Sequence, residues 1–171
     1  MLKEHIVRFD SRLTAAITGW PKWLQQPMLA VTFIGQPVCL IIMAVIVAAL
    51  NQNNHRIVLA LAAALGAMLI NSLVKHFVHR TRPDTLYVSN MYFKTASFPS
   101  GHAFGGVVVM GLLAYLTGTY VGTAFAAPIV LLIASIGLSR VYLGAHYPTD
   151  ILAGWVFGGL FLSIIIGVFH P

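Results

Sequence analysis

Long uncharged runs alternate with short polar segments along this chain, and the first stretch differs from the rest. Over residues 2–20, apolar residues recur on one side of a helical wheel: Leu2, Ile6, Phe9, Leu13, Ile17 and Trp20. The charged residues of this stretch fall elsewhere on the wheel, and Pro21 ends the pattern. The pattern predicts an amphipathic helix that lies in the plane of a membrane interface.

Five uncharged runs follow, and each is long enough to cross a membrane. They predict spans at about residues 28–50, 57–77, 101–120, 122–140 and 148–169. A helix needs about 20 apolar residues to cross a hydrocarbon core of ~30 Å. Pro37 and Pro128 lie inside two of these runs, where we expect them to kink the helix. The expected fold is all-α: a polytopic transmembrane helical bundle of five spans plus the interfacial helix, forming one membrane-embedded domain over residues 1–171.

The composition supports a membrane protein. Hydrophobic residues make up 58% of the chain, charged residues only 8%, and the mean hydropathy is +0.86. Soluble domains carry roughly 25% charged residues. The single cysteine, Cys39, excludes a disulfide framework and a cysteine metal site. No basic stripe with interleaved aromatic residues stands clear of the apolar runs, so nucleic-acid binding is not expected.

Three polar segments each adjoin the same end of an apolar run. They are KHFVHRTRP at residues 75–83, PSGH at residues 99–102 and SRVYLGAHYPTD at residues 139–150. Because the five spans alternate in direction, the N-terminal helix and all three segments share one membrane face. The sequence therefore predicts a single site at that face.

The cations of these segments suit a phosphoryl group. Lys75 and Arg82 are seven residues apart, so a helix that continues to Pro83 would place both on one face. Arg140 closes the fourth span. Three cations can neutralise phosphoryl oxygens, and the planar fork of arginine suits two oxygens at once. The alternative is that they extend to lipid headgroups. Two further cations are expected to be surface charges: Arg80 and Lys94.

The PSGH segment opens the third span. Unpaired backbone N–H groups at a helix start can bind an anion, and Gly101 allows the anion to approach closely. Ser100 adds a hydroxyl donor, although a serine here can also be a plain helix cap. His102 is placed to pass a proton to a group bound there.

In the third segment, His146 and Asp150 are four residues apart, with Pro148 at the expected first turn of a helix. This spacing lets the carboxylate hold one ring nitrogen and leaves the other free as a nucleophile. A metal site is the alternative, but the chain has four acidic residues in all, two of them in the N-terminal helix. With so few carboxylates near the two histidines, no metal and no other cofactor is expected.

Taken together, K-x6-R-P at residues 75–83, P-S-G-H at residues 99–102 and S-R-x5-H-x3-D at residues 139–150 resemble the motifs of the type 2 phosphatidic acid phosphatase family. Order and spacing match throughout, and the resemblance covers residues 57–169. Family members with a sixth span carry it before the amphipathic helix. The resemblance therefore implies a short, bacterial-type membrane lipid phosphatase.

The resemblance implies a role for each site residue. His146 would attack phosphorus and form a phosphohistidine, with Asp150 fixing its tautomer. His102 would protonate the leaving group and then activate water. The residues implied to hold the phosphoryl oxygens are Lys75, Arg82, Ser100, Gly101 and Arg140. Phosphoryl transfer depends mostly on positioning and charge stabilisation, so these donors suffice without metal.

The resemblance also implies the partners and the location. Expected substrates are lipid phosphates: polyprenyl diphosphate, phosphatidic acid, diacylglycerol pyrophosphate or phosphatidylglycerophosphate. Membrane lipids surround the protein, and the sequence leaves the oligomeric state open. The family places the site at the extracytoplasmic face of the plasma (inner) membrane. Nine of the ten Lys and Arg residues nevertheless lie on the site's side, with only Arg56 opposite, and this distribution argues for the cytoplasmic face.

Three alternatives share parts of this pattern. A lipid phosphotransferase would use the same site with a lipid acceptor in place of water. Vanadium haloperoxidases share the motifs, but they are soluble and lack five apolar spans. A membrane transporter or scaffold would need charges in the middle of a span, where this chain has only neutral polar residues such as Gln36 and Asn71.

Overall fold

The computed structural model describes residues 2–91 and 95–171, so the expectation for Lys94 lies outside the described residues. Within these ranges every regular element is helical, which confirms the all-α class. The helices are α1 (Leu2–Thr18), α2 (Gln25–Ile34), α3 (Pro37–Leu50), α4 (His55–Val78), α5 (Leu86–Ser89), α6 (Gly101–Gly105), α7 (Gly111–Tyr120), α8 (Thr123–Tyr142) and α9 (Pro148–Phe169). A 3-10 turn (Lys22–Leu24) precedes α2, and a π-helical segment (Gly106–Met110) joins α6 to α7.

Each of the five predicted runs is helical over most of its length. The runs of α4, of α6 with α7, and of α9 are long and apolar enough to cross a membrane. The pair α2 and α3 qualifies as a fourth span if the two helices are taken together, and α8 contains a shorter apolar helix, Ala126–Tyr142. The number of crossings therefore stays a prediction.

The predicted span over residues 28–50 is not one helix. Helix α2 ends at Ile34, α3 begins at Pro37, and the two helices meet at 50°. A proline lacks the N–H that would continue a helix, and it disfavours the helical conformation at the residue before it. Gln36 accordingly has extended torsions, φ −63° and ψ 141°. Pro37 thus starts a new helix, where the sequence analysis expected a kink.

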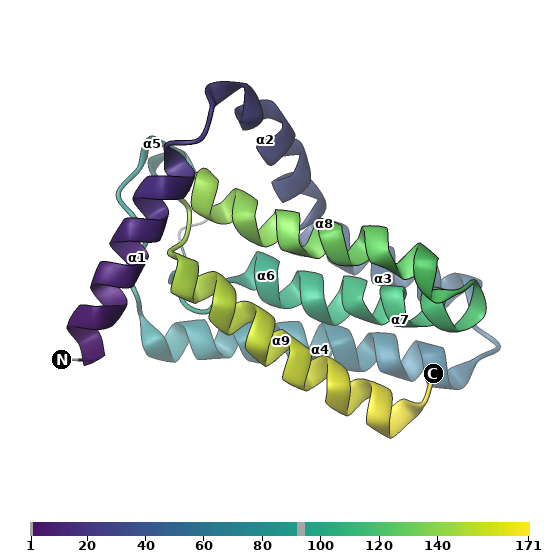
Figure 1. The fold of residues 1–171 in the computed structure, drawn as a ribbon. Helices are drawn as coiled ribbons and strands as arrows, with labels where there is room; N and C mark the ends of the chain where they lie inside the picture. Colours follow the sequence, from purple (N-terminus) through teal and green to yellow (C-terminus); the bar gives the residue numbers. More distant parts are fainter. Residues whose placement is uncertain (1, 92–94) are drawn as a thin grey trace.

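The main helices run side by side as a bundle, and the three polar segments all lie at the left end of it in Figure 1. Its core includes the fully buried side chains of Leu40, Leu61 and Phe104. Helix α9 lies very close to the start of α6. A Cβ atom on Gly154 would come within 2.9 Å of the Ser100 carbonyl oxygen, so only a glycine fits there. This close packing holds the start of α9 against the start of α6.

Helix α1 crosses the end of the bundle that carries the polar segments (Figure 1). Its apolar face is largely uncovered, since Ile6, Phe9 and Leu13 are exposed. The side chain that α1 buries is instead acidic: Asp10 is only 2% exposed. An exposed apolar face at the end of the bundle fits the predicted interfacial location, and the buried aspartate ties the helix to the site described next.

Candidate active site

The three polar segments line one large cavity of about 1290 Å³. Its polar end is formed by six residues from these segments and from α4: Asn71, Lys75, Arg82, His102, Arg140 and His146. Its other walls come mainly from α2, α3 and α4 and include Leu29, Val38, Ile41, Leu65, Met68 and Leu69. The cavity therefore joins a cationic, histidine-bearing end to an apolar one.

His146 lies in the loop between α8 and α9 and is almost fully buried. Its Nε2 lies 3.0 Å from Nη1 of Arg82. A guanidinium can only donate hydrogen bonds, so Nε2 must carry the lone pair and the proton resides on Nδ1. Nδ1 in turn faces Oγ of Ser97 at 3.3 Å and Oδ2 of Asp150 at 3.5 Å. Nε2, the ring nitrogen that contacts Arg82, is thus the one with the lone pair.

The surroundings of His146 keep its imidazole neutral. Burial, together with the positive charges of Arg82, Arg140 and Lys75, lowers the pKa of His146 to about 3, against the opposing hydrogen bond with Asp150. At neutral pH the ring therefore keeps its lone pair available, as a nucleophile requires.

Asp150 is held from several sides at the first turn of α9. Its Oδ2 accepts hydrogen bonds from the Ser97 hydroxyl and, at 2.9 Å, from the backbone N–H of Tyr147. Pro148 occupies the first turn of α9, as predicted. The predicted proximity of the carboxylate to Nδ1 of His146 is present, but Ser97 lies between the two groups as an additional partner.

The cations approach the cavity from separate elements. On α4, Lys75 donates from Nζ to the carbonyl of Ala96 at 3.0 Å. On α8, Arg140 is 2% exposed and donates from Nη1 to the hydroxyls of Thr32 (2.7 Å) and Tyr87 (3.0 Å). The Nε atom of Arg140 is buried and has no hydrogen-bond partner among the described residues. A buried, unpartnered donor beside a cavity is suited to an anionic ligand.

Arg82 lines the cavity, but it does not lie on the continued helix that the sequence predicted. Helix α4 ends at Val78, and His79 adopts a left-handed conformation with φ 51°, so Arg82 is not on a helical face shared with Lys75. It follows the helix in an irregular segment and donates to the carbonyls of Thr95 (2.8 Å) and Ala145 (2.9 Å). Burial and the nearby Arg140 lower the pKa of Arg82 to about 10, which leaves it charged at neutral pH.

Arg80 is not the surface charge that the sequence suggested. Its side chain is 25% exposed and donates from Nη1 to Oδ1 of Asp150 at 2.7 Å and from Nη2 to Oδ2 of Asp10 at 2.6 Å. Burial acts to lower the pKa of Arg80, but the hydrogen bonds and charges of the two carboxylates outweigh it and raise that pKa. Arg80 thus contacts Asp150 and is not part of the cavity lining that the structure describes.

Residues of PSGH lie where the sequence placed them, at the start of α6. The Ser100 side chain accepts from the backbone N–H of Ala103 at 3.4 Å, so it caps the helix. Gly101 and His102 line the cavity. A Cβ atom on Gly101 would lie 3.6 Å from Cε of Lys75, so the absence of a side chain keeps this part of the cavity open. Ser100 itself is fully buried and is not part of the described cavity lining.

Several residues around the site were missed by the sequence analysis: Asp10, Thr32, Tyr87, Ser97 and Thr149. Their partners lie far away in the chain, so no local spacing marks them. A partial signal existed for Asp10, since it is one of only four acidic residues. Within residues 2–91 and 95–171, no three His, Cys, Asp or Glu side chains are grouped as a metal site would require.

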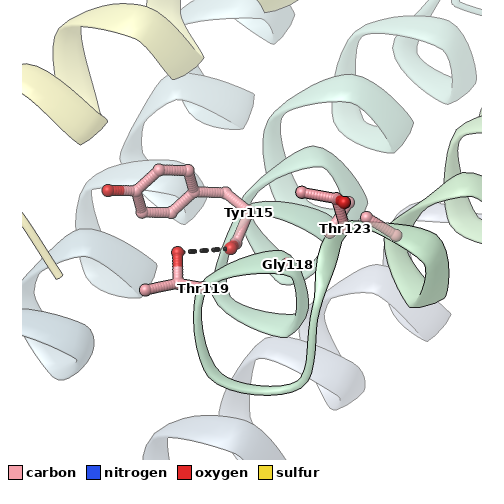
Figure 2. A pocket seen from close by; sticks show the side chains of 6 residues that line it. Tyr115, Gly118, Thr119 and Thr123 are labelled. Atoms are coloured by element: carbon pink, nitrogen blue, oxygen red, sulfur yellow. Dashed lines mark hydrogen bonds between the residues drawn. The ribbon is translucent and has the colours of Figure 1, made fainter.

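A second pocket of about 400 Å³ lies where α7 turns into α8, at the opposite end of the bundle from the polar segments (Figures 1 and 2). Figure 2 shows the side chains of Tyr115, Thr119 and Thr123 around it. The Thr119 hydroxyl is already bonded to the carbonyl of Tyr115 at 2.8 Å. The described residues that line this pocket carry no charge and belong to none of the three motifs.

Comparisons with known proteins agree with this arrangement. Residues 56–170 match the family model described as PAP2 superfamily. The chain is 29% identical over 162 residues to phosphatidylglycerophosphatase B of Bacillus subtilis, covering 90% of this chain and 79% of that protein. It is 28% identical over 131 residues to undecaprenyl-diphosphatase BcrC of Bacillus subtilis, covering 75% of this chain and 63% of that protein.

A solved structure extends the match to three dimensions. The crystal structure of a transmembrane PAP2 type phosphatidylglycerolphosphate phosphatase from Bacillus subtilis superposes with a TM-score of 0.82 at 26% identity. The match covers 93% of this chain and 83% of that one. The chain belongs to the PAP2 superfamily. The predicted family and the prediction of a membrane phosphatase are confirmed.

Proposed function

We propose that this phosphatase removes phosphate from a lipid phosphate or diphosphate through a phosphohistidine on His146, without a metal. One observation carries the proposal: a single cavity joins the lone pair on Nε2 of His146, the buried Arg140 and the half-buried Lys75 and Arg82 to the apolar walls of α3 and α4. An amphiphilic cavity of this kind matches a substrate with a charged head and an apolar tail.

In the first step, Nε2 of His146 attacks phosphorus, the N–P bond forms, and the P–O bond to the lipid breaks. His102 gives a proton to the departing oxygen. The new phosphohistidine is cationic at its ring, and Asp150 stabilises it through Nδ1–H. In the second step, His102 removes a proton from water, the water oxygen bonds to phosphorus, the N–P bond breaks, and phosphate leaves.

The cations stabilise the charge on the transferring group. Arg82 must release Nε2 of His146 when a substrate arrives, and its guanidinium then binds phosphoryl oxygens. The partnerless Nε of Arg140 and the Lys75 ammonium complete a positively charged cage. Gly101 provides a backbone N–H at the start of α6. Ser100 contributes by capping α6 and so fixing the position of that N–H.

The substrate class follows from the cavity and from the relatives. Its apolar walls accept an acyl or prenyl chain, which can stay within the bilayer. The printed names of the relatives point to phosphatidylglycerophosphate and undecaprenyl diphosphate. Phosphatidic acid and diacylglycerol pyrophosphate share the same chemistry, with a phosphate or diphosphate on a lipid anchor.

The test is phosphate release by the purified protein from micelles of phosphatidylglycerophosphate, phosphatidic acid or undecaprenyl diphosphate. We expect release from at least one lipid, no loss of rate in a chelator, and no detectable release by His146→Ala. An acid-labile, base-stable phosphoryl label should appear on the wild-type protein after rapid quenching. Wild-type turnover by the folded His146→Ala variant would overturn the mechanism. Less free phosphate when a lipid acceptor is added would instead indicate a phosphotransferase.

We further infer that residues 1–171 form one domain in the plasma (inner) membrane, with five crossings and α1 at the interface on the side of the site. The family's orientation places this side outside the cytoplasm, although the Lys and Arg distribution favours the reverse. In a Cys39→Ser background, an impermeant thiol reagent on intact cells should label Lys22→Cys and spare Arg56→Cys. The opposite labelling pattern would place the site in the cytoplasm.

A further inference from the structure

A buried chain of polar groups connects helix α1 to the catalytic pair. It begins at Asp10, whose Oδ1 accepts from the backbone N–H of Thr149 at 3.0 Å. Its Oδ2 accepts from the Thr149 hydroxyl at 2.7 Å and from Arg80 at 2.6 Å. A carboxylate buried to this extent is tolerated only when partners compensate for its lost hydration. Asp10 is therefore committed to this network and to no solvent contact.

Arg80 is the centre of the network. Its Nη1 donates to Oδ1 of Asp150 at 2.7 Å and to the Thr149 hydroxyl at 2.8 Å. Its guanidinium lies over the Tyr147 ring, with the central carbon 4.5 Å from the ring centroid. The planar fork of arginine can hold two carboxylates in fixed directions at once, which a lysine cannot reproduce with the same geometry. The side chain of Arg80 is thus fixed on three sides.

The two oxygens of Asp150 have separate tasks. Oδ1 is held by Arg80, while Oδ2 faces Ser97, the Tyr147 N–H and Nδ1 of His146. Without a partner on Oδ1, the carboxylate could rotate and weaken its contact with the imidazole. Arg80 therefore sets the plane of the carboxylate that orients the nucleophile, while Arg82, two residues later, faces the cavity.

The network also balances the charge of Arg80 between two carboxylates. Arg80 lies between two carboxylates, so Asp10 offsets part of the positive charge that Arg80 presents to Asp150. Asp150 consequently keeps enough negative charge to stabilise a cationic phosphohistidine. If Asp10 lost its charge, Arg80 would act on Asp150 alone and reduce that stabilisation.

We propose that Asp10 and Arg80 are positioning residues, which act through Asp150 to hold His146 in its reactive orientation. The inference rests on the proposed function of His146 as nucleophile. On this proposal the rate of the reaction depends on α1, because Asp10 on this helix contributes a negative charge next to the active site. The alternative is that the network only anchors α1 to the start of α9.

The test measures kcat and KM for phosphatidylglycerophosphate in micelles with Arg80→Met, Arg80→Lys and Asp10→Asn, each normalised to folded protein from size-exclusion chromatography. We expect kcat to fall by about 10–100-fold in Arg80→Met, a range typical of residues that orient a catalytic or metal-bound histidine. KM should stay within about twofold, because Arg80 does not line the described cavity. Arg80→Lys should recover part of kcat. Arg12→Met, an exposed arginine on the same helix as Asp10, serves as the matched control and should retain wild-type kcat.

The double variant Asp10→Asn with Arg80→Met separates positioning from anchoring. If Asp10 acts on the site through Arg80, the double variant should be no slower than Arg80→Met, because the charge to be balanced is gone. An unchanged kcat per folded molecule in Arg80→Met, or independent multiplicative losses in the double variant, would overturn the proposal and leave only anchoring. Turnover by His146→Ala, or no turnover by the wild type, would instead refute the proposed function.

Discussion

Arg82 donates a hydrogen bond from Nη1 to Nε2 of His146 across 3.0 Å. This contact fixes the tautomer of the imidazole and covers its lone pair. In the proposed mechanism the same guanidinium binds oxygens of the transferring phosphoryl group. Substrate binding therefore exchanges one partner of Arg82 for another and uncovers the nucleophile in the same movement.

Replacement of this arginine should change the pH dependence of the reaction. The positive charge of Arg82 lowers the pKa of His146, so Arg82→Met should raise that pKa from its value of about 3. The acid limb of kcat/KM reports groups of the free enzyme, and it should therefore move to higher pH in the variant. The overall rate should also fall, because a phosphate ligand is lost.

The measurement is kcat/KM on one lipid substrate, for wild type and variant in parallel, from about one pH unit below the His146 pKa of about 3 to about one unit above the usual pKa of histidine. Titration of the substrate phosphate affects both proteins equally, so the difference isolates the enzyme. An acid limb at the same pH in both proteins would contradict the proposed coupling.

Gly101→Ala should impair substrate binding without affecting stability. The added methyl group would meet Cε of Lys75 at 3.6 Å and Nδ2 of Asn71 at 3.8 Å, which are ordinary contacts. It would nevertheless occupy the part of the cavity where a phosphoryl group approaches the start of α6. We expect kcat/KM to fall by about tenfold, equivalent to ~1.4 kcal/mol of lost transition-state binding. Gly159→Ala, where a methyl group meets nothing within 4 Å, is the matched control.

Gly154→Ala should instead reduce stability. Its methyl group would lie 2.9 Å from both the Ser100 carbonyl oxygen and Cβ of Ala103, so α9 would have to move away from α6. Overpacking of this kind costs about 1–3 kcal/mol. The free energy of unfolding in detergent should fall by this amount, while Gly159→Ala on the same helix should raise it by up to about 1 kcal/mol, because alanine is the better helix former. Equal stability of both variants would show that the close helix contact is not formed.

Blocking the apolar wall should discriminate between substrates by chain length. Ile41 lines the cavity on α3, so Ile41→Trp should raise KM for a long-chain lipid phosphate by about tenfold, or ~1.4 kcal/mol. A short-chain analogue with the same headgroup should be turned over normally. Ile42→Trp is the matched control, because Ile42 is exposed like Ile41 but is not part of the described lining. A similar KM increase for both chain lengths would argue against a tail in this part of the cavity.

The site was predictable largely because its residues are marked by local spacing. His146 and Asp150 are four residues apart, and Ser100, Gly101 and His102 are consecutive. The expected alternation of the spans was enough to predict that these segments lie at one end of the bundle. The cavity does contain His102 and His146 together. Their catalytic roles rest on the experiments above.

The errors have equally specific physical causes. Arg80 and its partner Asp10 are 70 residues apart, and no periodicity in the sequence marks a pairing over that separation. The break before Pro37 was a different kind of error, since the restriction that proline places on Gln36 already favours an extended residue there. The end of α4 at Val78 depends on the left-handed His79, a conformation that is uncommon for histidine and has no strong sequence signal.

The cavity between the cationic end and the apolar walls of α3 and α4 also determines how the enzyme encounters its substrate. A lipid whose tail stays among these side chains is delivered by diffusion in two dimensions. Its effective concentration is then its mole fraction in the bilayer, and diluting it with inert lipid slows turnover even when the bulk amount is constant. Only inorganic phosphate and water need to cross the aqueous boundary during the catalytic cycle.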